Sequence, residues 1–428
     1  MDTIFAQATA PGRAGVSVVR ISGPTVREIL VQIAGSAPKP RHASLREICD
    51  SNGELIDRSL VLFFEGPHSF TGEDVAELHL HGSIAVVQSV LDLLGTFGGT
   101  RLAEAGEFTR RALENDKIDL TQAEGLADLI EAETGAQRKQ ALKVVSGKFK
   151  ERVERWRAQL IRAASLVEAT IDFADEDIPI DVTDEVDALL RSVLADLKLE
   201  IDGTLIAERV KTGFEVAIVG APNVGKSTLL NALAGRDAAI TSSTAGTTRD
   251  IVEVRMNLSG LPVTFLDTAG LRDTADEVEQ LGIKRAISRA ESADMRVFLT
   301  DGSDHLSVRH LDDDIIIKPK ADLMPDDKNA VSGLTGQGID ALVGRIKDVL
   351  SARVATIGLA THQRHRVAMK SAVSYLDAAR QVLSDGPDLY DIAAAELGFA
   401  IRALEVLVGR VDVESLLDEI FSSFCVGK

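Results

Sequence analysis

The sequence predicts a multidomain protein of the α/β plus all-α class, in which an α/β domain is inserted between two halves of a helical domain. Two changes of residue pattern within the 428 residues indicate this organisation. Short β-rich runs give way to apolar residues at helical spacing near Leu120, and a buried-strand pattern begins at Phe214. A chain of this length holds about two to four domains.

Residues 1–117 are expected to form an α+β domain. Turn signals such as Ser22-Gly23-Pro24 separate β-rich runs at Gly15–Ile21, Ser59–Phe64 and Val75–Leu80, and a helix-like stretch follows at Ile84–Leu94. Short runs of both kinds are typical of a mixed α/β region.

Residues 118–210 and 351–428 are expected to be the two halves of the helical domain. Apolar residues recur there at spacings of three and four, and stretches such as Ile392–Leu407 are rich in Ala, Leu and Glu. The acidic break Asp172–Pro179 is expected to join two of the helices.

Residues 211–350 are expected to be the α/β domain, because strand-like and helix-like runs alternate there. FEVAIV is a buried-strand pattern, and Gly220–Ser227 follows it as G-x-x-x-x-G-K-[ST] before the helical TLLNALAG. In this context the glycines let backbone amides face a β-phosphate, Lys226 reaches the β/γ oxygens, and the Ser227 hydroxyl binds Mg²⁺. The motif predicts a nucleotide triphosphate site.

Two later segments predict that the bound triphosphate is sensed. The loop Ser242–Asp250 offers Thr248, with Thr247 as the second choice, to complete Mg²⁺ coordination and contact the γ-phosphate. A second strand ends at Asp267, which suits an outer-shell Mg²⁺ role, and the Gly270 amide suits the γ-phosphate. The segments together indicate a hydrolytic switch.

Guanine is the expected base, with one departure from the usual Asn-Lys-x-Asp pattern. After the strand-like Ile315–Ile317, Lys320 and Asp322 fit that pattern, and Asp322 can accept hydrogen bonds from guanine N1–H and the 2-amino group. Pro319 stands in the Asn place and cannot supply a side-chain amide. Ser332-Gly333-Leu334 is the expected final guanine loop, also altered. Guanine selection is therefore expected to depend on Asp322.

The net charge of −19 argues against a surface uniformly suited to nucleic acid. A local basic patch stays open over Arg138–Arg162, where nine Lys/Arg accompany two Glu, although a solvated helix face is the simpler interpretation. Two distant cysteines, Cys49 and Cys425, and the absence of a signal-like start or bilayer-length apolar run predict a cytoplasmic protein.

Several motifs in the same order resemble the bacterial MnmE (TrmE) family of tRNA-modification GTPases over nearly the full length. They are ATAPGRAGVSVVRISGP, FTGEDVAELHLHG, AGEFTRRALENDKIDLTQAEGLADLI, IDFADEDIP, AGTTRD with DTAGLR, and the terminal Cys-Val-Gly-Lys. The resemblance implies a P-loop GTPase domain inserted in a helical domain and preceded by an α+β folate-binding and dimerisation domain.

The resemblance also assigns sites. Arg20, Glu77, Lys117 and Lys428 stand where the family contacts 5-formyltetrahydrofolate. Asn223, Ser242, Thr244 and Thr247 stand at potassium-ligand positions, and Ser227 with Thr248 at those for Mg²⁺. The water-orienting role falls on Glu279, with Glu277 as its nearest rival, and Lys226 completes the catalytic pair. The GTP-binding set comprises Asn223, Val224, Gly225, Lys226, Ser227, Thr228, Ser242, Ser243, Thr244, Ala245, Gly246, Thr247, Thr248, Asp267, Thr268, Ala269, Gly270, Lys320, Asp322, Ser332, Gly333 and Leu334.

By the same resemblance the chain is expected to be a homodimer that works with the flavoprotein MnmG. Together they would modify carbon 5 of the wobble uridine in tRNA, using a tetrahydrofolate one-carbon unit, with GTP hydrolysis activated by potassium-dependent association of G domains. Two alternatives stay open: a ribosome-assembly GTPase switch, and a folate-binding scaffold with a weakened G domain. Cys425 is either a reactive thiol or a packed apolar residue.

Overall fold

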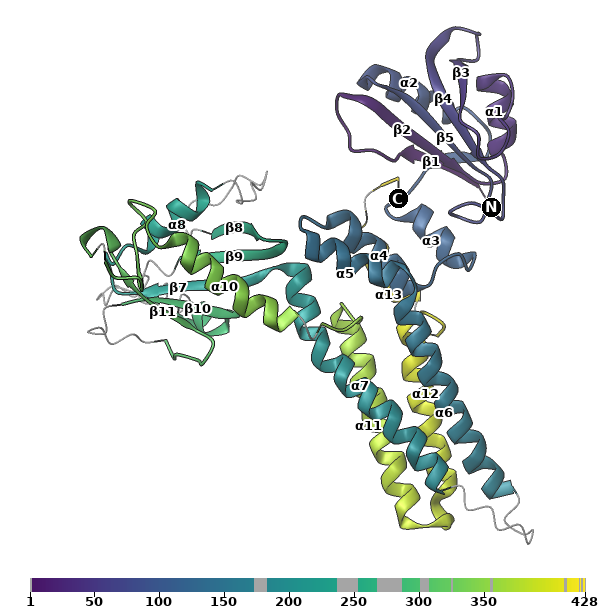
Figure 1. The fold of residues 1–428 in the computed structure, drawn as a ribbon. Coiled ribbons are helices and arrows are strands. Elements are labelled where there is room, and N and C mark those ends of the chain that lie inside the picture. The colour runs from purple at the N-terminus through teal and green to yellow at the C-terminus, as the bar shows by residue number, and fades with distance from the viewer. Residues whose placement is uncertain are drawn as a thin grey trace, which may run out of the picture. The chain divides into compact units, whose positions relative to one another are not determined.

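A computed structural model gives the three-dimensional structure (Figure 1). It describes residues 2–172, 183–236, 253–267, 287–300, 308–324, 326–354, 357–411, 414–422, 424 and 426–427. The chain separates into two compact units, which are described in turn. The first contains Met1–Ala127 and Glu405–Lys428, and the second contains Asp128–Leu404.

The first unit is built on a six-stranded sheet in the order β3-β4-β5-β2-β1-β6. The strands are β1 (Thr3–Gln7), β2 (Ala14–Ser22), β3 (Ser44–Cys49), β4 (Leu55–Phe64), β5 (Val75–Gly82) and β6 (Thr100–Leu102). Neighbours are antiparallel except β1 and β6. Helices α1 (Val26–Ala34) and α2 (Ile84–Leu94) bury their apolar residues against one sheet face. The opposite face carries Arg20 and Glu77 in register.

A second layer of the first unit brings the two ends of the chain together. Helix α3 (Glu107–Glu114) and helix α13 (Glu414–Ser422) lie in contact, and Leu120, Phe421 and Phe424 belong to one small core. A β-bridge joins Ala105 to Val426. Residues near the end of the chain therefore lie beside its first strands, where they can take part in a site.

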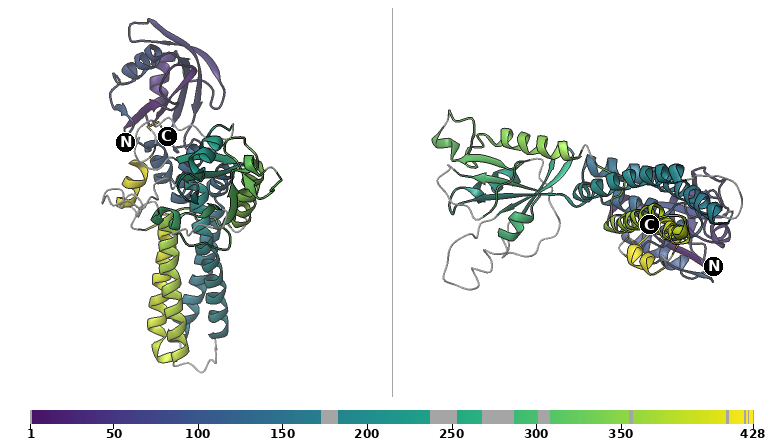
Figure 2. Two further views of the ribbon diagram at one scale, coloured as in Figure 1. Left: turned by 90° about the vertical axis from the view of Figure 1, so that its left-hand side faces the viewer. Right: turned by 90° about the horizontal axis from the view of Figure 1, so that it is seen from below.

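The second unit contains a helical bundle (Figure 2). Its helices are α6 (Lys148–Asp172), α7 (Thr183–Thr212), α11 (Gln363–Asp385) and most of α12 (Tyr390–Leu407), preceded by the end of α4 (Leu120–Glu131) and by α5 (Gly135–Val145). Apolar residues at spacings of three and four form the bundle core, as the pattern predicts. They include Trp156, Leu160, Ala163, Val167, Val186, Leu190, Val193, Leu197, Met369, Ala372, Leu376, Ala379, Ala393, Leu397, Ala400 and Leu404.

The α/β part of the second unit has a six-stranded sheet in the order β12-β11-β10-β7-β9-β8. The strands are β7 (Phe214–Gly220), β8 (Glu253–Leu258), β9 (Leu261–Asp267), β10 (Met295–Leu299), β11 (Ile315–Pro319) and β12 (Ala330–Val331). Only the β8–β9 pair is antiparallel among them. Helices α8 (Lys226–Ala234) and α10 (Ile339–Val354) contribute to its apolar core. The carboxyl ends of β7, β9 and β11 meet at one edge, where open α/β sheets bind ligands.

The predicted fold class is confirmed: an α/β domain with a P-loop topology lies within a helical domain and follows an α+β domain. The expected helix at Ile84–Leu94 coincides with α2, and FEVAIVG coincides with β7. Residues 173–182, which hold most of the predicted acidic break, lie outside the described residues, and α6 and α7 end and begin on either side. The short elements α1, β1 and β3 were not predicted, because a short run of apolar residues gives no clear periodicity.

Candidate functional site

The P-loop follows β7 and leads into α8, as the motif predicts. Gly220 has no room for a side chain, since a Cβ there would lie 2.7 Å from the Leu299 carbonyl oxygen. Gly225 caps α8 with a φ of +113°, a left-handed conformation that favours glycine. The two motif glycines thus let the chain turn tightly beside a neighbouring strand and begin a helix whose N-terminus can bind phosphate.

Lys226 lies inside this loop. Its ammonium donates hydrogen bonds to the carbonyl oxygens of Gly220 at 2.8 Å and Ala221 at 2.9 Å, and the residue is 6% exposed. Burial lowers the pKa of the Lys226 ammonium below its ordinary 10.5, and the Asp267 carboxylate opposes this only in part. A buried cation with two neutral acceptors is ready to exchange them for phosphate oxygens, which stabilise its charge better.

Ser227 and Asp267 meet at the carboxyl end of β9. The Ser227 hydroxyl donates to an Asp267 carboxylate oxygen at 2.7 Å, and Asp267 is 5% exposed. A hydroxyl and a carboxylate are oxygen donors of the kind that Mg²⁺ accepts together with phosphate oxygens and water. The two residues therefore fit the predicted magnesium site, with Ser227 as a ligand and Asp267 behind it.

A pocket of about 300 Å³ joins the P-loop to the predicted base-recognition segments. Its lining includes the predicted residues Asn223, Val224, Gly225, Thr228, Lys320, Asp322, Ser332, Gly333 and Leu334, and also Pro319. Gly333 allows the last loop to touch α8, since a Cβ there would lie 2.5 Å from the Leu229 nitrogen. The structure thus brings the P-loop together with two predicted base-recognition segments that follow it by about a hundred residues.

The remaining predicted residues of this site lie outside the described residues. They are Ser242, Ser243, Thr244, Ala245, Gly246, Thr247, Thr248, Thr268, Ala269, Gly270, Glu277 and Glu279. Of the predicted potassium ligands only Asn223 is described; it is exposed and has a φ of +58°.

A second candidate site lies on the open sheet face of the first unit. The Arg20 guanidinium donates to one Glu77 carboxylate oxygen from Nε at 3.1 Å and from Nη2 at 2.9 Å. It also reaches the Gly427 carbonyl oxygen at 3.4 Å and lies near two aromatic rings, with its carbon 6.0 Å from the Phe70 centroid and 5.7 Å from that of Phe108. Cation, carboxylate and aromatic surface therefore meet beside the C-terminal segment.

Lys117 approaches the same region through the loop that carries Phe70. A Cβ on Gly72 would lie 2.8 Å from the Lys117 Cε, so the lysine stem covers this loop. The Lys117 side chain is exposed, and Lys428 and Cys425 lie outside the described residues. No direct contact joins Lys117 to Arg20 or Glu77 among the contacts of the described residues.

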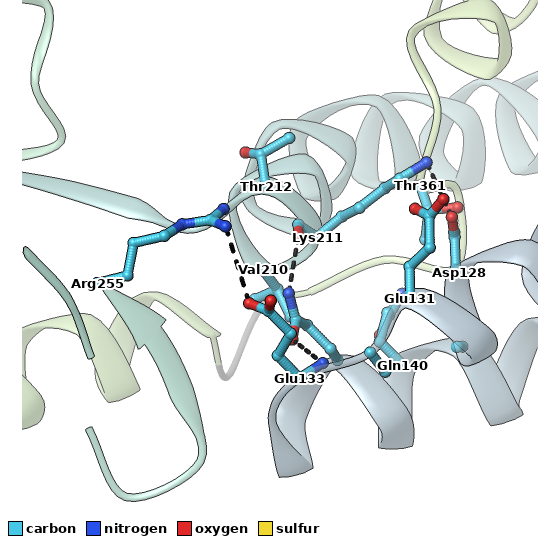
Figure 3. A pocket seen from close by; sticks show the side chains of 12 residues that line it. Asp128, Glu131, Glu133, Gln140, Val210, Lys211, Thr212, Arg255 and Thr361 are labelled. Carbon is cyan, nitrogen blue, oxygen red and sulfur yellow. Dashed lines mark hydrogen bonds and ion pairs between the residues drawn. The ribbon is translucent and has the colours of Figure 1, made fainter. Parts of the chain in front are cut away.

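A polar pocket of about 270 Å³ lies in the second unit and was not predicted from the sequence (Figure 3). Asp128 forms ion pairs with Lys211 at 2.8 Å and with His362 at 3.3 Å, and Arg255 of β8 faces Glu133 at 3.9 Å. Burial acts to raise the pKa of Asp128, but His362 and Lys211 prevail and lower it. Strand β8 follows the predicted switch loop in sequence, so the pocket links that strand to the helices. These charged residues come from separate elements, so no local sequence motif predicts the pocket.

Metal binding by His79 and His81, which share a strand face, finds no support. His79 lies 3.4 Å from Glu77 and His81 lies 2.7 Å from Asp57. Over the described ranges, no group of three or more His, Cys, Asp or Glu side chains could hold a metal ion. No described helix combines the length and apolar character needed to cross a bilayer.

A parallel sheet with a P-loop, a Ser–Asp pair beside it and a base pocket at its edge defines a P-loop GTPase inserted in a helical domain. Comparison with known proteins agrees. Residues 3–117 match the family model "GTP-binding protein TrmE N-terminus", and residues 120–425 match "MnmE helical domain". The chain belongs to the MnmE family of tRNA modification GTPases.

Relatives named tRNA modification GTPase MnmE align over the whole of both chains. Those of Roseobacter denitrificans and Ruegeria pomeroyi are each 61% identical over 428 residues, and that of Paracoccus denitrificans is 48% identical over 434. Among solved structures, Aquifex aeolicus Era bound to GDP and AlF₄⁻ is 31% identical, covering 32% of this chain and 56% of that one, with a TM-score of 0.24. The chain is accordingly a GTPase enzyme.

Proposed function

We propose that this GTPase modifies carbon 5 of the wobble uridine in tRNA, together with a flavoprotein partner of the MnmG type and a tetrahydrofolate one-carbon unit. The proposal is carried by full-length similarity to relatives named for tRNA modification, at up to 61% identity. The joint presence of a nucleotide site and a second charged site in the other unit supports it, since the chemistry then has separate places for GTP and for a cofactor.

In the nucleotide site, Lys226 neutralises charge on the β- and γ-phosphates, and Ser227 with Asp267 holds Mg²⁺. A Mg²⁺ ion held there would supply positive charge that stabilises the charge developing during phosphoryl transfer. Thr248 completes its coordination, and Glu279 orients the attacking water. Potassium held by Asn223, Ser242, Thr244 and Thr247 supplies further positive charge when two G domains associate.

Folate chemistry suits the open sheet face of the first unit. A pterin presents an amide edge that a carboxylate such as Glu77 can accept hydrogen bonds from, and its glutamate tail needs cations such as Arg20, Lys117 and Lys428. The Arg20–Glu77 pair is about four-fifths buried, which keeps both groups fixed before a ligand arrives. Phe70 and Phe108 add an aromatic surface beside them.

A homodimer formed through the same sheet face accounts for two exposed apolar side chains there. Leu45 is 65% exposed and Leu60 is 45% exposed, and the two are paired across β3 and β4. Leu60 also pairs with His79, two residues from Glu77 on β5, so both leucines share the face that carries the proposed folate site. Covering them by a second copy removes apolar surface from water.

The catalytic part is tested by the GTPase rate in potassium against sodium buffer. Strong potassium stimulation that is lost in Glu279→Ala and kept in Glu277→Ala is expected. No turnover in either salt, or equal loss in both variants, would contradict the assignment. Mass spectrometry of wobble uridine in tRNA from a deletion strain, with and without the wild-type gene, tests the tRNA modification. The wobble uridine is expected to be unmodified in the deletion strain and modified again when the gene is returned.

The cofactor part is tested by titrating 5-formyltetrahydrofolate into the full chain. Glu77→Gln removes a charged acceptor and should weaken binding about 10- to 100-fold, as for hydrogen bonds to charged groups. Glu47→Gln is the matched control, because Glu47 lies on the same sheet but is paired with exposed Arg58. Equal affinity of the two variants would refute the site.

A further inference from the structure

An exposed group of cations surrounds a hollow on helices α5 and α6. The hollow has a volume of about 430 Å³ and is lined by Lys143, Lys148, Glu151, Arg152 and Arg155 with the backbone segment 357–359. On α6 the spacing from Lys148 to Arg152 and then to Arg155 is four and three residues, which places all three on one helix face. Lys139 lies one turn before Lys143 on α5 and lines the neighbouring pocket.

Most of these cations have no acidic partner among the described residues. Arg152 is paired with the buried Glu200, whereas Lys139, Lys143, Lys148 and Arg155 are exposed and form no ion pair within the described ranges. Glu151 is the one acidic residue in the lining, and Lys143, Lys148 and Arg155 outweigh it, which leaves a net charge of about +2 around the hollow. On a chain with a net charge of −19, such a local concentration of positive charge attracts an anionic partner.

Glu200 holds the hollow in shape. This 1% exposed carboxylate pairs with Arg152 and accepts hydrogen bonds from the backbone nitrogens of Leu359 and, at 3.0 Å, Ala360. Gly358 lies so close that a Cβ there would be 2.6 Å from a Glu200 oxygen. One wall of the hollow is therefore fixed by a buried, satisfied network, while the free cations face its open side.

The spread of the cations favours a polyanion over a single phosphate. Seven residues separate Lys148 from Arg155, about 10 Å along a helix. In double-helical DNA each strand carries a charge about every 3.4 Å of helix axis, so a length of this order spans about three phosphates of a duplex strand. The start of α6 at Lys148 adds the positive end of a helix dipole. The aromatic residues of this region, Phe149 and Trp156, are both fully buried, so no ring is offered for base stacking.

We propose that the hollow bounded by Lys143, Lys148 and Arg155 binds the phosphate backbone of an RNA helix. It is a site for the body of the tRNA, without base recognition, and it rests on the proposed function for the identity of the RNA. Backbone contacts of this kind position the nucleic acid, and the nucleotide sequence is read elsewhere.

Fluorescence anisotropy of labelled tRNA with the full chain, from 50 to 200 mM KCl, tests the site. Three phosphate contacts change the slope of log affinity against log salt by about two to three. The variant K143Q/K148Q/R155Q should bind tRNA more weakly than the wild type at 50 mM KCl. Between 50 and 200 mM KCl, the factor by which its affinity falls should be about 20- to 40-fold smaller than the factor for the wild type. The matched control K347Q/K370Q/R309Q removes two lysines and one arginine that are exposed elsewhere in the same unit and should follow the wild type.

If K143Q/K148Q/R155Q shows the wild-type slope, the hollow is not an RNA site, although tRNA binding by the protein still stands. If the wild type binds no tRNA, both the RNA site and the proposed function are contradicted. An equal loss in the control variant shows an effect of net charge alone and overturns the site. Polyglutamate that competes as strongly as an RNA duplex overturns it in favour of an acidic protein partner. Unchanged GTP hydrolysis without RNA shows that each variant is folded.

Discussion

Replacing Pro319 by asparagine should strengthen guanine nucleotide binding. Pro319 ends β11, lines the base pocket beside Lys320 and Asp322, and has no donor to offer in either its ring or its backbone nitrogen. Guanine presents N7 as an acceptor on its major-groove edge, away from the N1–H and 2-amino groups that Asp322 can accept from. An asparagine amide at this position can donate to N7, so the substitution adds one hydrogen bond to the complex.

The expected gain follows from the environment of the pocket. A neutral hydrogen bond contributes about 0.5–1.5 kcal/mol net, which corresponds to about 2- to 12-fold in affinity. The same substitution releases backbone freedom in the unfolded chain and costs about 0.4–1 kcal/mol of stability where proline fits without strain. Affinity and melting temperature of the nucleotide-free protein should therefore move in opposite directions.

Calorimetry with GDP and with 7-deaza-GDP separates the hydrogen bond from other effects. Pro319→Ala is the matched control, because it removes the ring without adding an amide. Tighter GDP binding by Pro319→Asn than by Pro319→Ala, abolished with the 7-deaza analogue, is the expected pattern. An equal gain for both nucleotides would refute donation to N7, and equal affinities of the two variants would show that residue 319 does not face the base.

Three other predictions concern charged groups. GDP affinity should fall as pH rises toward 10.5, because burial lowers the Lys226 pKa in the free protein and bound phosphate restores the proton. Proton uptake on GDP binding, measured by calorimetry in buffers of different ionisation enthalpy, should grow over that pH range. A constant proton uptake would contradict this prediction. Asp314→Ala should destabilise the G domain by about 3–5 kcal/mol, because it removes the carboxylate that lies 2.8 Å from the guanidinium of Arg296, a charged side chain that is only 3% exposed. Faster amide hydrogen exchange in β10 would measure this loss of stability. Burial acts to raise the pKa of Glu107, but Arg101 and Arg111 prevail and hold it below the ordinary 4.5, so its contribution is complete above about pH 4.5 and lost as pH falls further. Because this loss occurs below about pH 4.5, the melting temperature of Glu107→Gln should fall less than that of the wild type when the pH is lowered from 7 to well below 4.5.

The strand, loop and helix of the P-loop could be predicted from the sequence because they are local. Gly220–Ser227 carries its own turn, helix start and phosphate ligands, and its strand and helix flank it directly. The meeting of Ser227 with Asp267 follows from parallel strands ending at one edge. The α+β domain was harder, because Arg20 and Glu77 are 57 residues apart and only strand register unites them. Resemblance, and not periodicity, pointed to that pair.

Other features depend on tertiary packing that no local pattern encodes. The helical spacing of α7 does not distinguish Glu200 from an exposed glutamate. In the structure it is buried, and it accepts a hydrogen bond from Leu359, which is 159 residues away in the sequence. Asp128 and Lys211 are similar, since each is an ordinary surface type until α4 and α7 bring them together. The basic run Arg138–Arg162 was visible in the sequence, but which of its cations lack partners was not.

Both connections of the α/β domain are attached to the same helix. The chain enters it through the last turn of α7, where the Lys211 carbonyl accepts a hydrogen bond from Gln137 at 2.8 Å. It returns through residues 357–360, which the Glu200 side chain of α7 holds by two backbone nitrogens. A movement of the α/β domain would therefore act on one helix at two points, about ten residues or 15 Å apart. The bundle would receive that movement through a single helix, and not through two independent ones.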